Sequence, residues 1–143
     1  MSAMRLVKTV LKFVLAAFFV AAGVQHFRDP EFFLKIVPDY IPTNLHAPAV
    51  DVSGLFEILL GIMLLAPKTS RLAAWGMIAL LVAVFPANIY LYQHPQIMPE
   101  VSPTFHFWRL PLQGVLIAWA YWYTRPNRPR TGEAPAAPRS DVP

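Results

Sequence analysis

Four stretches of this 143-residue chain are apolar over nearly the whole length that a helix needs to cross a lipid bilayer. A crossing takes about 20 residues at a rise of about 1.5 Å each. The stretches cover about residues 10–27, 48–66, 71–91 and 103–123. Only 14% of the residues are charged, against roughly a quarter in soluble domains. The sequence therefore predicts an all-α membrane protein, a four-transmembrane-helix bundle that forms one domain over residues 1–125.

A short helix and a tail complete the predicted architecture. Asp29 is a suitable cap for a helix that begins with Pro30 and ends before Pro38. One side of this segment is apolar, so we expect a short interfacial helix between helices 1 and 2. The link over residues 67–70 is short enough to make its flanking helices antiparallel neighbours. Residues 126–143 are proline-rich and polar, which predicts a disordered cytoplasmic tail.

The basic residues predict the orientation of the bundle. With four crossings, most of them fall on one side, namely Arg5, Lys8, Lys12, Lys68, Arg71, Arg125, Arg128, Arg130 and Arg139. Lys and Arg gather on the cytoplasmic side of membrane proteins. We therefore expect the N-terminus and the C-terminus to be cytoplasmic. The same placement explains the net charge of +4 without nucleic acid as a partner.

Two polar pairs lie inside the predicted second and fourth crossings. Ser53 and Glu57 are one turn apart in the second, and Arg109 and Gln113 are one turn apart in the fourth. Both helices run inward, and both pairs lie in the outer half, with Glu57 and Gln113 about 14–15 Å below the outer helix ends. Charge at such depth usually survives only when it is paired or used. We therefore expect Glu57 and Arg109 to meet.

Three interpretations of that pair stay open. It is a structural ion pair that fixes helix register, a ligand or proton site open to the outside, or no pair at all because Arg109 reaches the outer surface. His26 and Asn88 add polar groups to the same outer half of the bundle. Gly54 and Gly61 flank Glu57 at helical spacing, which would let another helix approach closely.

The chain offers little intrinsic chemistry. It has no cysteine, which excludes disulfides, thiolate metal sites and a dithiol relay. No phosphate loop, nucleophile elbow or zinc-protease motif occurs, so we assign no catalytic residue and no metal ligand. One alternative is a metal site at the outer face built by the four histidines, which are His26, His46, His94 and His106.

Several segments together resemble the DoxX-like family of small membrane proteins. They are Ala22–Phe27, Pro30–Phe33, Ile36–Pro38, Tyr40–Pro42, Ser53–Gly61, Phe85–Tyr90 and Arg109–Gln113. The resemblance implies a multi-pass four-helix bundle in the bacterial inner (cytoplasmic) membrane. Relatives are loosely described as components of quinone-linked oxidoreductases. The family has no agreed catalytic residues, so none is transferred to this chain.

We therefore expect a non-catalytic membrane component with a periplasm-facing polar pocket. It would bind a small amphipathic molecule, such as a quinone or a lipid, or a membrane or periplasmic protein partner. The predicted pocket residues are Glu57, Arg109, Gln113, Ser53, Asn88 and His26. Two alternatives stay open: a membrane subunit of a quinone-linked oxidoreductase system, in which Glu57 and His26 would pass protons, and a small oligomeric transporter or assembly factor. Quinone is the one cofactor that these readings suggest.

Overall fold

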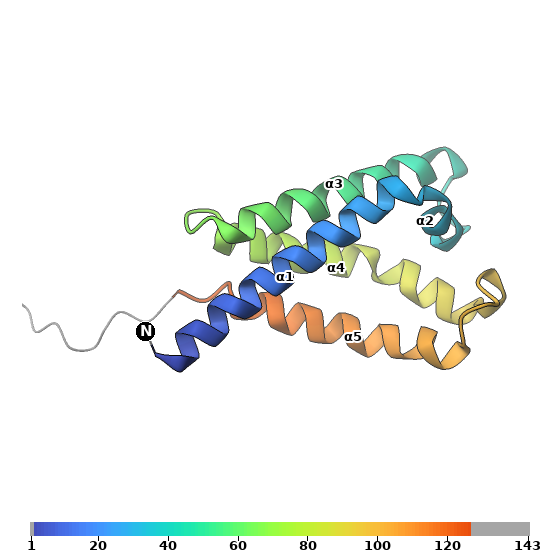
Figure 1. Cartoon of the computed structure of the whole chain (residues 1–143). Coiled ribbons are helices and arrows are strands. Elements are labelled where there is room, and N and C mark those ends of the chain that lie inside the picture. The colour runs from blue at the N-terminus through green and yellow to red at the C-terminus, as the bar shows by residue number, and fades with distance from the viewer. Residues whose placement is uncertain (1, 127–143) are drawn as a thin grey trace, which may run out of the picture.

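The computed structural model describes residues 2–126, and every regular element in this range is helical (Figure 1). The α-helices are α1 (Ala3–Arg28), α2 (Pro30–Ile36), α3 (His46–Leu65), α4 (Ser70–Gln93) and α5 (Pro103–Trp122). Two single 3-10 turns, η1 (Thr43–Leu45) and η2 (Pro95–Ile97), lie in the connections. The all-α class is confirmed, whereas a count of four membrane helices is not. The tail predicted to be disordered lies outside the described residues from position 127 on.

Proline and a capping side chain start two of these helices. Asp29 accepts a hydrogen bond from the Phe32 amide at 3.4 Å, and Pro30 is the first residue of α2. Ser102 accepts one from the Phe105 amide at 3.3 Å, and Pro103 opens α5. The first N–H groups of a helix have no partner inside it, so a side-chain oxygen satisfies one of them and proline removes another. The local sequence therefore determines where both helices begin.

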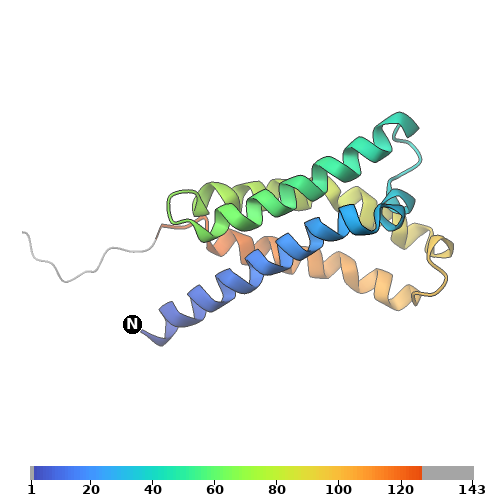
Figure 2. The same ribbon diagram turned by 45° about the horizontal axis from the view of Figure 1, so that its top comes forward.

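The four long helices form two pairs. α1 packs along α3, α4 packs along α5, and α3 and α4 are antiparallel neighbours joined by a short turn. The pairs lie close together at the end that carries the N-terminus and the α3–α4 turn, and they separate toward the other end (Figures 1 and 2). The short helix α2 lies at this wider end and contacts α1, α3 and α4. An apolar core of Leu15, Phe19, Leu64, Met77 and neighbouring side chains fills the narrow end.

Three glycines bring α1 and α3 into close contact. A Cβ added to Gly23 would lie 2.5 Å from the carbonyl oxygen of Gly54. A Cβ on Gly54 would lie 2.5 Å from His26 Cβ, and one on Gly61 would lie 2.7 Å from a methyl group of Val20. Small residues let two backbones approach this closely. The predicted close approach at Gly54 and Gly61 is confirmed, and its partner is α1.

The surface of the long helices is apolar. Exposed fractions reach 56% for Ile62, 66% for Leu72, 58% for Val82 and 59% for Val115. Within residues 2–126, three helices are long and apolar enough to cross a membrane by length and composition: α1, α3 with its preceding turn, and α4. α5 has 20 residues, as many as α3, yet it does not qualify by composition. Its sequence contains His106, Arg109 and Gln113, which lower its mean hydropathy.

The glycine contact predicts opposite effects of the same substitution at two helical sites. Gly54→Ala should lower the free energy of unfolding by about 1–3 kcal/mol, because the new methyl group overlaps His26. Gly114→Ala is the matched control, because nothing lies within 4 Å of a Cβ there. The control should leave stability unchanged or raise it by up to ~1 kcal/mol through helix propensity. Unfolding followed by circular dichroism in detergent measures both, and equal effects would refute a packed glycine seam.

Candidate functional site

A cavity of about 630 Å³ lies between the two helix pairs, at the end where they separate. Its walls come from α1, α2, α3, α4 and α5 and from the segment that follows α2. Most of the lining is apolar, including Phe18, Phe33, Leu81, Val84 and Leu116. Two lining residues, Tyr40 and Phe105, are 71% and 57% exposed, so the cavity is not fully enclosed. Its volume is in the range of sites that bind small molecules.

Every predicted pocket residue lines this cavity. Glu57 and Ser53 come from α3, Arg109 and Gln113 from α5, His26 from α1 and Asn88 from α4; the complete predicted set is Glu57, Arg109, Gln113, Ser53, Asn88 and His26. The pairing inside the set differs from the prediction. Glu57 and Arg109 form no ion pair in the part of the chain that the structure describes. Glu57 instead meets His26, whose Nε2 lies 3.2 Å from Glu57 Oε2.

The helix packing explains this correction. Glu57 lies on α3, which packs along α1, whereas Arg109 lies on α5, which packs along α4. The two charged residues are thus carried by different helix pairs, and these pairs separate where the cavity lies (Figure 1). The glycine contact between α1 and α3 holds His26 beside Gly54, one turn from Glu57. Shared depth in the membrane was therefore not sufficient to bring carboxylate and guanidinium together.

Three contacts hold the His26 ring in place. Its Nδ1 lies 2.9 Å from the carbonyl oxygen of Val50, its Nε2 faces Glu57, and its face stacks on Phe33 with ring centroids 3.7 Å apart. The residue is only 8% exposed. Phe33 belongs to α2, so this short helix covers the histidine. A half-turn of the ring would lose both polar contacts.

These contacts limit the protonation states that suit His26 and Glu57. A carbonyl oxygen can only accept, so Nδ1 carries a hydrogen and donates it to Val50. Nε2 then carries a proton only if the ring is cationic. A neutral ring facing an ionised carboxylate would set two acceptors against each other, so the neutral ring requires a protonated Glu57. The pair holds one transferable proton in either arrangement. Glu57 Oε2 is buried, and among residues 2–126 its 3.2 Å contact with His26 Nε2 is not aligned as a hydrogen bond.

Arg109 contributes a positive charge to the same cavity. Its side chain is half-buried and lines the wall provided by α5. Across residues 2–126 it has no carboxylate partner within ion-pair distance. A partly buried guanidinium has five N–H donors to satisfy, and it binds carboxylate, phosphate or carbonyl oxygen strongly. Arg109 is therefore the group in this cavity best suited to hold a ligand.

Gln113 and Asn88 join α4 to α5. Asn88 donates to Gln113 Oε1 at 2.6 Å, and Gln113 in turn donates to the backbone carbonyl of Leu81. Gln113 is only 3% exposed. Pro86 lies inside α4 five residues past Leu81, where it removes one N–H from the helical ladder. Asn88 thus bonds across helices, and Gln113 is anchored rather than free for a ligand.

The four histidines do not gather. His46 bonds the carbonyl of Ile41, and His94 bonds that of Tyr90, while His26 bonds Val50. His106 is buried on α5, and neither of its ring nitrogens has a partner in the described part of the chain. No group of three or more His, Asp or Glu residues within positions 2–126 could hold a metal ion. The alternative of a four-histidine metal site is therefore wrong.

The contact between His26 and Glu57 escaped the sequence analysis, although the sequence contains a signal for it. Each residue follows a glycine by three positions, as Gly23 precedes His26 and Gly54 precedes Glu57. A glycine one turn away marks the place where a neighbouring backbone comes close. Matching glycine and polar spacings on two helices would have indicated that these helices meet. The roles of Val50 and Phe33 depend on the fold around them, and no sequence pattern indicates either.

Thermodynamic coupling distinguishes the observed pair from the predicted one. In a double-mutant cycle, His26→Gln and Glu57→Gln should couple by about 0.5–2 kcal/mol, because they share a buried contact. The cycle of Glu57→Gln with Arg109→Met should be additive within about 0.5 kcal/mol. Unfolding free energies in detergent provide both values. Strong coupling in the second cycle and none in the first would mean that Glu57 pairs with Arg109 after all.

Comparison with known proteins gives a family but no activity. No curated protein and no solved structure matches the chain. The resemblance to DoxX-like proteins remains a prediction. One family model, described as a domain of unknown function (DUF8561), matches residues 15–124, which include all four long helices in whole or in large part. This chain therefore belongs to the DUF8561 family.

Proposed function

We propose that this protein is a four-crossing membrane protein whose cavity binds a small amphipathic molecule, without catalysing a reaction itself. The observation that carries the proposal is the combination of an apolar cavity of about 630 Å³ with Arg109, which has no carboxylate partner among residues 2–126. The apolar walls suit a hydrocarbon or ring body. The guanidinium suits one carbonyl, carboxylate or phosphate group at the head of that body.

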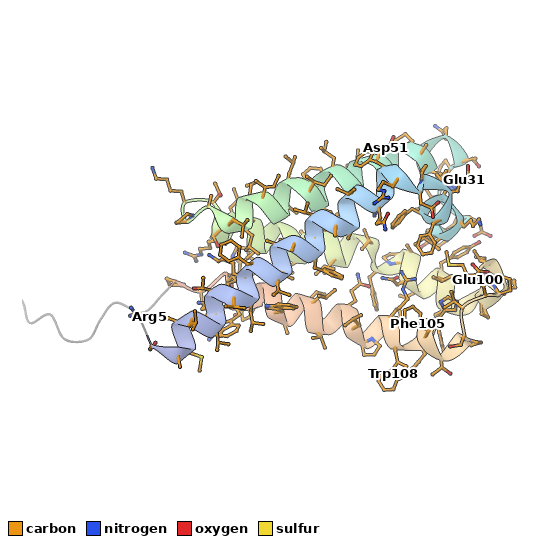
Figure 3. The ribbon with its side chains drawn as sticks, viewed as in Figure 1. Arg5, Glu31, Asp51, Glu100, Phe105 and Trp108 are labelled. Atoms are coloured by element: carbon orange, nitrogen blue, oxygen red, sulfur yellow. The ribbon has the colours of Figure 1, made fainter. Side chains whose placement is uncertain are left out.

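The distribution of polar and apolar side chains around α5 supports a fourth crossing. Its polar residues His106 and Gln113 are 1% and 3% exposed, and Arg109 faces the cavity. Most of its exposed side chains are apolar, including Trp108 at 61% and Val115 at 59%, and Trp108 points away from the bundle (Figure 3). Low mean hydropathy in α5 thus reflects inward-facing polar groups, and its outer surface suits lipid.

The charge distribution supports an opening toward the periplasm. Arg5 lies at one end of the bundle, while Glu31, Asp51 and Glu100 lie at the other (Figure 3). The basic end is the cytoplasmic one by the distribution of Lys and Arg, and the cavity lies at the opposite end. With four crossings, both termini are on the cytoplasmic side. The resemblance to DoxX-like proteins adds the bacterial inner membrane as the expected location.

A second candidate function rests on the contact between His26 and Glu57. A quinone is an amphipathic ring with two carbonyl oxygens, and its reduction takes up two protons along with two electrons. His26 Nε2 and Glu57 Oε2 lie 3.2 Å apart, a separation that allows proton exchange, and both residues line the cavity. In this role the protein would be the membrane subunit of a quinone-linked oxidoreductase system, with His26 and Glu57 as a proton path. The electrons would come from a partner protein.

Arg109→Gln should weaken the binding of the retained molecule by roughly tenfold or more, because a hydrogen bond from a charged donor contributes about 1.5–3 kcal/mol. Native mass spectrometry of protein extracted gently from its own membrane measures occupancy and identifies the ligand. Arg28→Gln is the matched control, because it removes the same charge from an exposed site outside the cavity.

Three outcomes separate the candidates. A lipid or another amphipathic molecule that is lost in Arg109→Gln and kept in Arg28→Gln supports the binding role. A retained quinone with the same dependence favours the oxidoreductase subunit. Equal occupancy in wild type and both variants, or no retained small molecule in any of them, contradicts binding in this cavity.

A further inference from the structure

The four long helices that surround the cavity at Arg109 are packed against one another on three sides of the bundle. α1 packs along α3, α3 along α4, and α4 along α5. Within the described residues, α1 and α5 make at most a marginal contact with each other, and they diverge toward the wider end (Figures 1 and 2). Both helices nevertheless contribute side chains to the lining of the cavity. The side between α1 and α5 is therefore the one on which the cavity is least closed.

Exposed apolar side chains border the cavity on this side. Phe18 on α1 and Leu112 on α5 both line the cavity, yet they are 49% and 52% exposed. Each lies one helical turn from an exposed residue that does not line the cavity, which is Val14 on α1 and Trp108 on α5. Phe18 and Leu112 thus lie where the cavity meets the apolar outer surface of the bundle. We call the space between α1 and α5 at these two residues the lateral gap.

The polar and apolar parts of the cavity are arranged in the same order as those of a lipid. Arg109 and His26 lie toward the wider end of the bundle, which is the periplasmic end in the proposed orientation. On α1, Phe18 lies about 12 Å further from that end than His26 does. On α5, Leu116 lies about 10 Å further from it than Arg109 does. A phospholipid of the periplasmic leaflet likewise has its phosphate at the surface and its acyl chains toward the bilayer midplane.

We propose that the cavity binds a phospholipid of the periplasmic leaflet, with its phosphate at Arg109 and its acyl chains leaving through the lateral gap. This inference rests on the proposed function and narrows the ligand to one class. A guanidinium binds a phosphate through two parallel hydrogen bonds. A cavity of about 630 Å³ holds a drug-sized molecule, so a two-chain lipid keeps part of its hydrocarbon outside. The lateral gap lets these chains stay in the bilayer, which avoids the cost of exposing them to water.

A phosphatidylglycerol that carries a photoreactive diazirine in the middle of one acyl chain tests the path of the chain. It is added to the full-length protein in detergent at a one-to-one ratio and irradiated, and mass spectrometry identifies the labelled segments. Arg109→Gln should reduce labelling of residues 18–22 and 112–116, which border the lateral gap, at least fivefold. Labelling at Val82, which is exposed and outside the cavity, should not change. Arg28→Gln, the matched charge control, should leave both signals as in the wild type.

Filling the lateral gap provides an independent test. Leu112→Trp should weaken the binding of phosphatidylglycerol at least fivefold, because the larger ring occupies the space through which the chains leave. Val115→Trp is the matched control, because Val115 lies one turn away on the same helix but does not line the cavity. Native mass spectrometry of the full-length protein measures both affinities. Glycerol phosphate, the headgroup chemistry without acyl chains, should bind to the wild type at least 100-fold more weakly than phosphatidylglycerol.

Three results would overturn this inference and leave the proposed binding role intact. In the first, glycerol phosphate binds as tightly as phosphatidylglycerol. In the second, the molecule whose retention depends on Arg109 is a quinone or another compound that is not a phospholipid. In the third, Val115→Trp weakens phosphatidylglycerol binding as much as Leu112→Trp does, or chain labelling at the lateral gap is the same in Arg109→Gln. A failure of the proposed function looks different, because then no bound molecule of any kind depends on Arg109.

Discussion

The close contact of α1 and α3 at their glycines determines how the side chains are arranged at the wider end of this protein. At Gly23 and Gly54 the two helices are so close that neither position has room for a methyl group. This contact sets His26 against α3, within 3.2 Å of Glu57 and 2.9 Å of the Val50 carbonyl. A buried carboxylate in an apolar bundle needs a partner, and the glycines determine that the partner is a histidine from the neighbouring helix.

The cavity exists because each helix pair is held together by contacts of its own. α1 and α3 are joined through glycines and the His26–Glu57 contact, whereas α4 and α5 are joined through Asn88 and Gln113. Each pair satisfies most of its own polar groups, so nothing requires the two pairs to close on each other at the wider end. Arg109 has no carboxylate partner among residues 2–126, and it lines the space between the two pairs. Binding is therefore proposed at Arg109, and proton exchange at His26 and Glu57.

Much of the architecture was predictable because it depends on local sequence and hydrophobicity. Asp29 with Pro30 starts α2, and long apolar stretches make the long helices. The membership of the polar cluster was also predictable, since polar residues in apolar helices turn inward. The pairing of Glu57 was not, because depth along a helix says nothing about which neighbour its side chain faces. The stacking of Phe33 on His26 and the hydrogen bond from the Tyr123 hydroxyl to the Lys8 carbonyl depend on segments that only the tertiary fold brings together.

Access from water to the middle of α4 tests the central claim most directly. The chain has no cysteine, so single cysteines can be introduced without background. Val84 lines the cavity, whereas Val82, about 3 Å away along the helix, is 58% exposed on the outer surface and does not line it. A membrane-impermeant thiol reagent added to the periplasmic side should label Val84→Cys and leave Val82→Cys unlabelled. Equal labelling of both, or labelling of Val84→Cys only from the cytoplasmic side, would contradict the proposed cavity that opens to the periplasm.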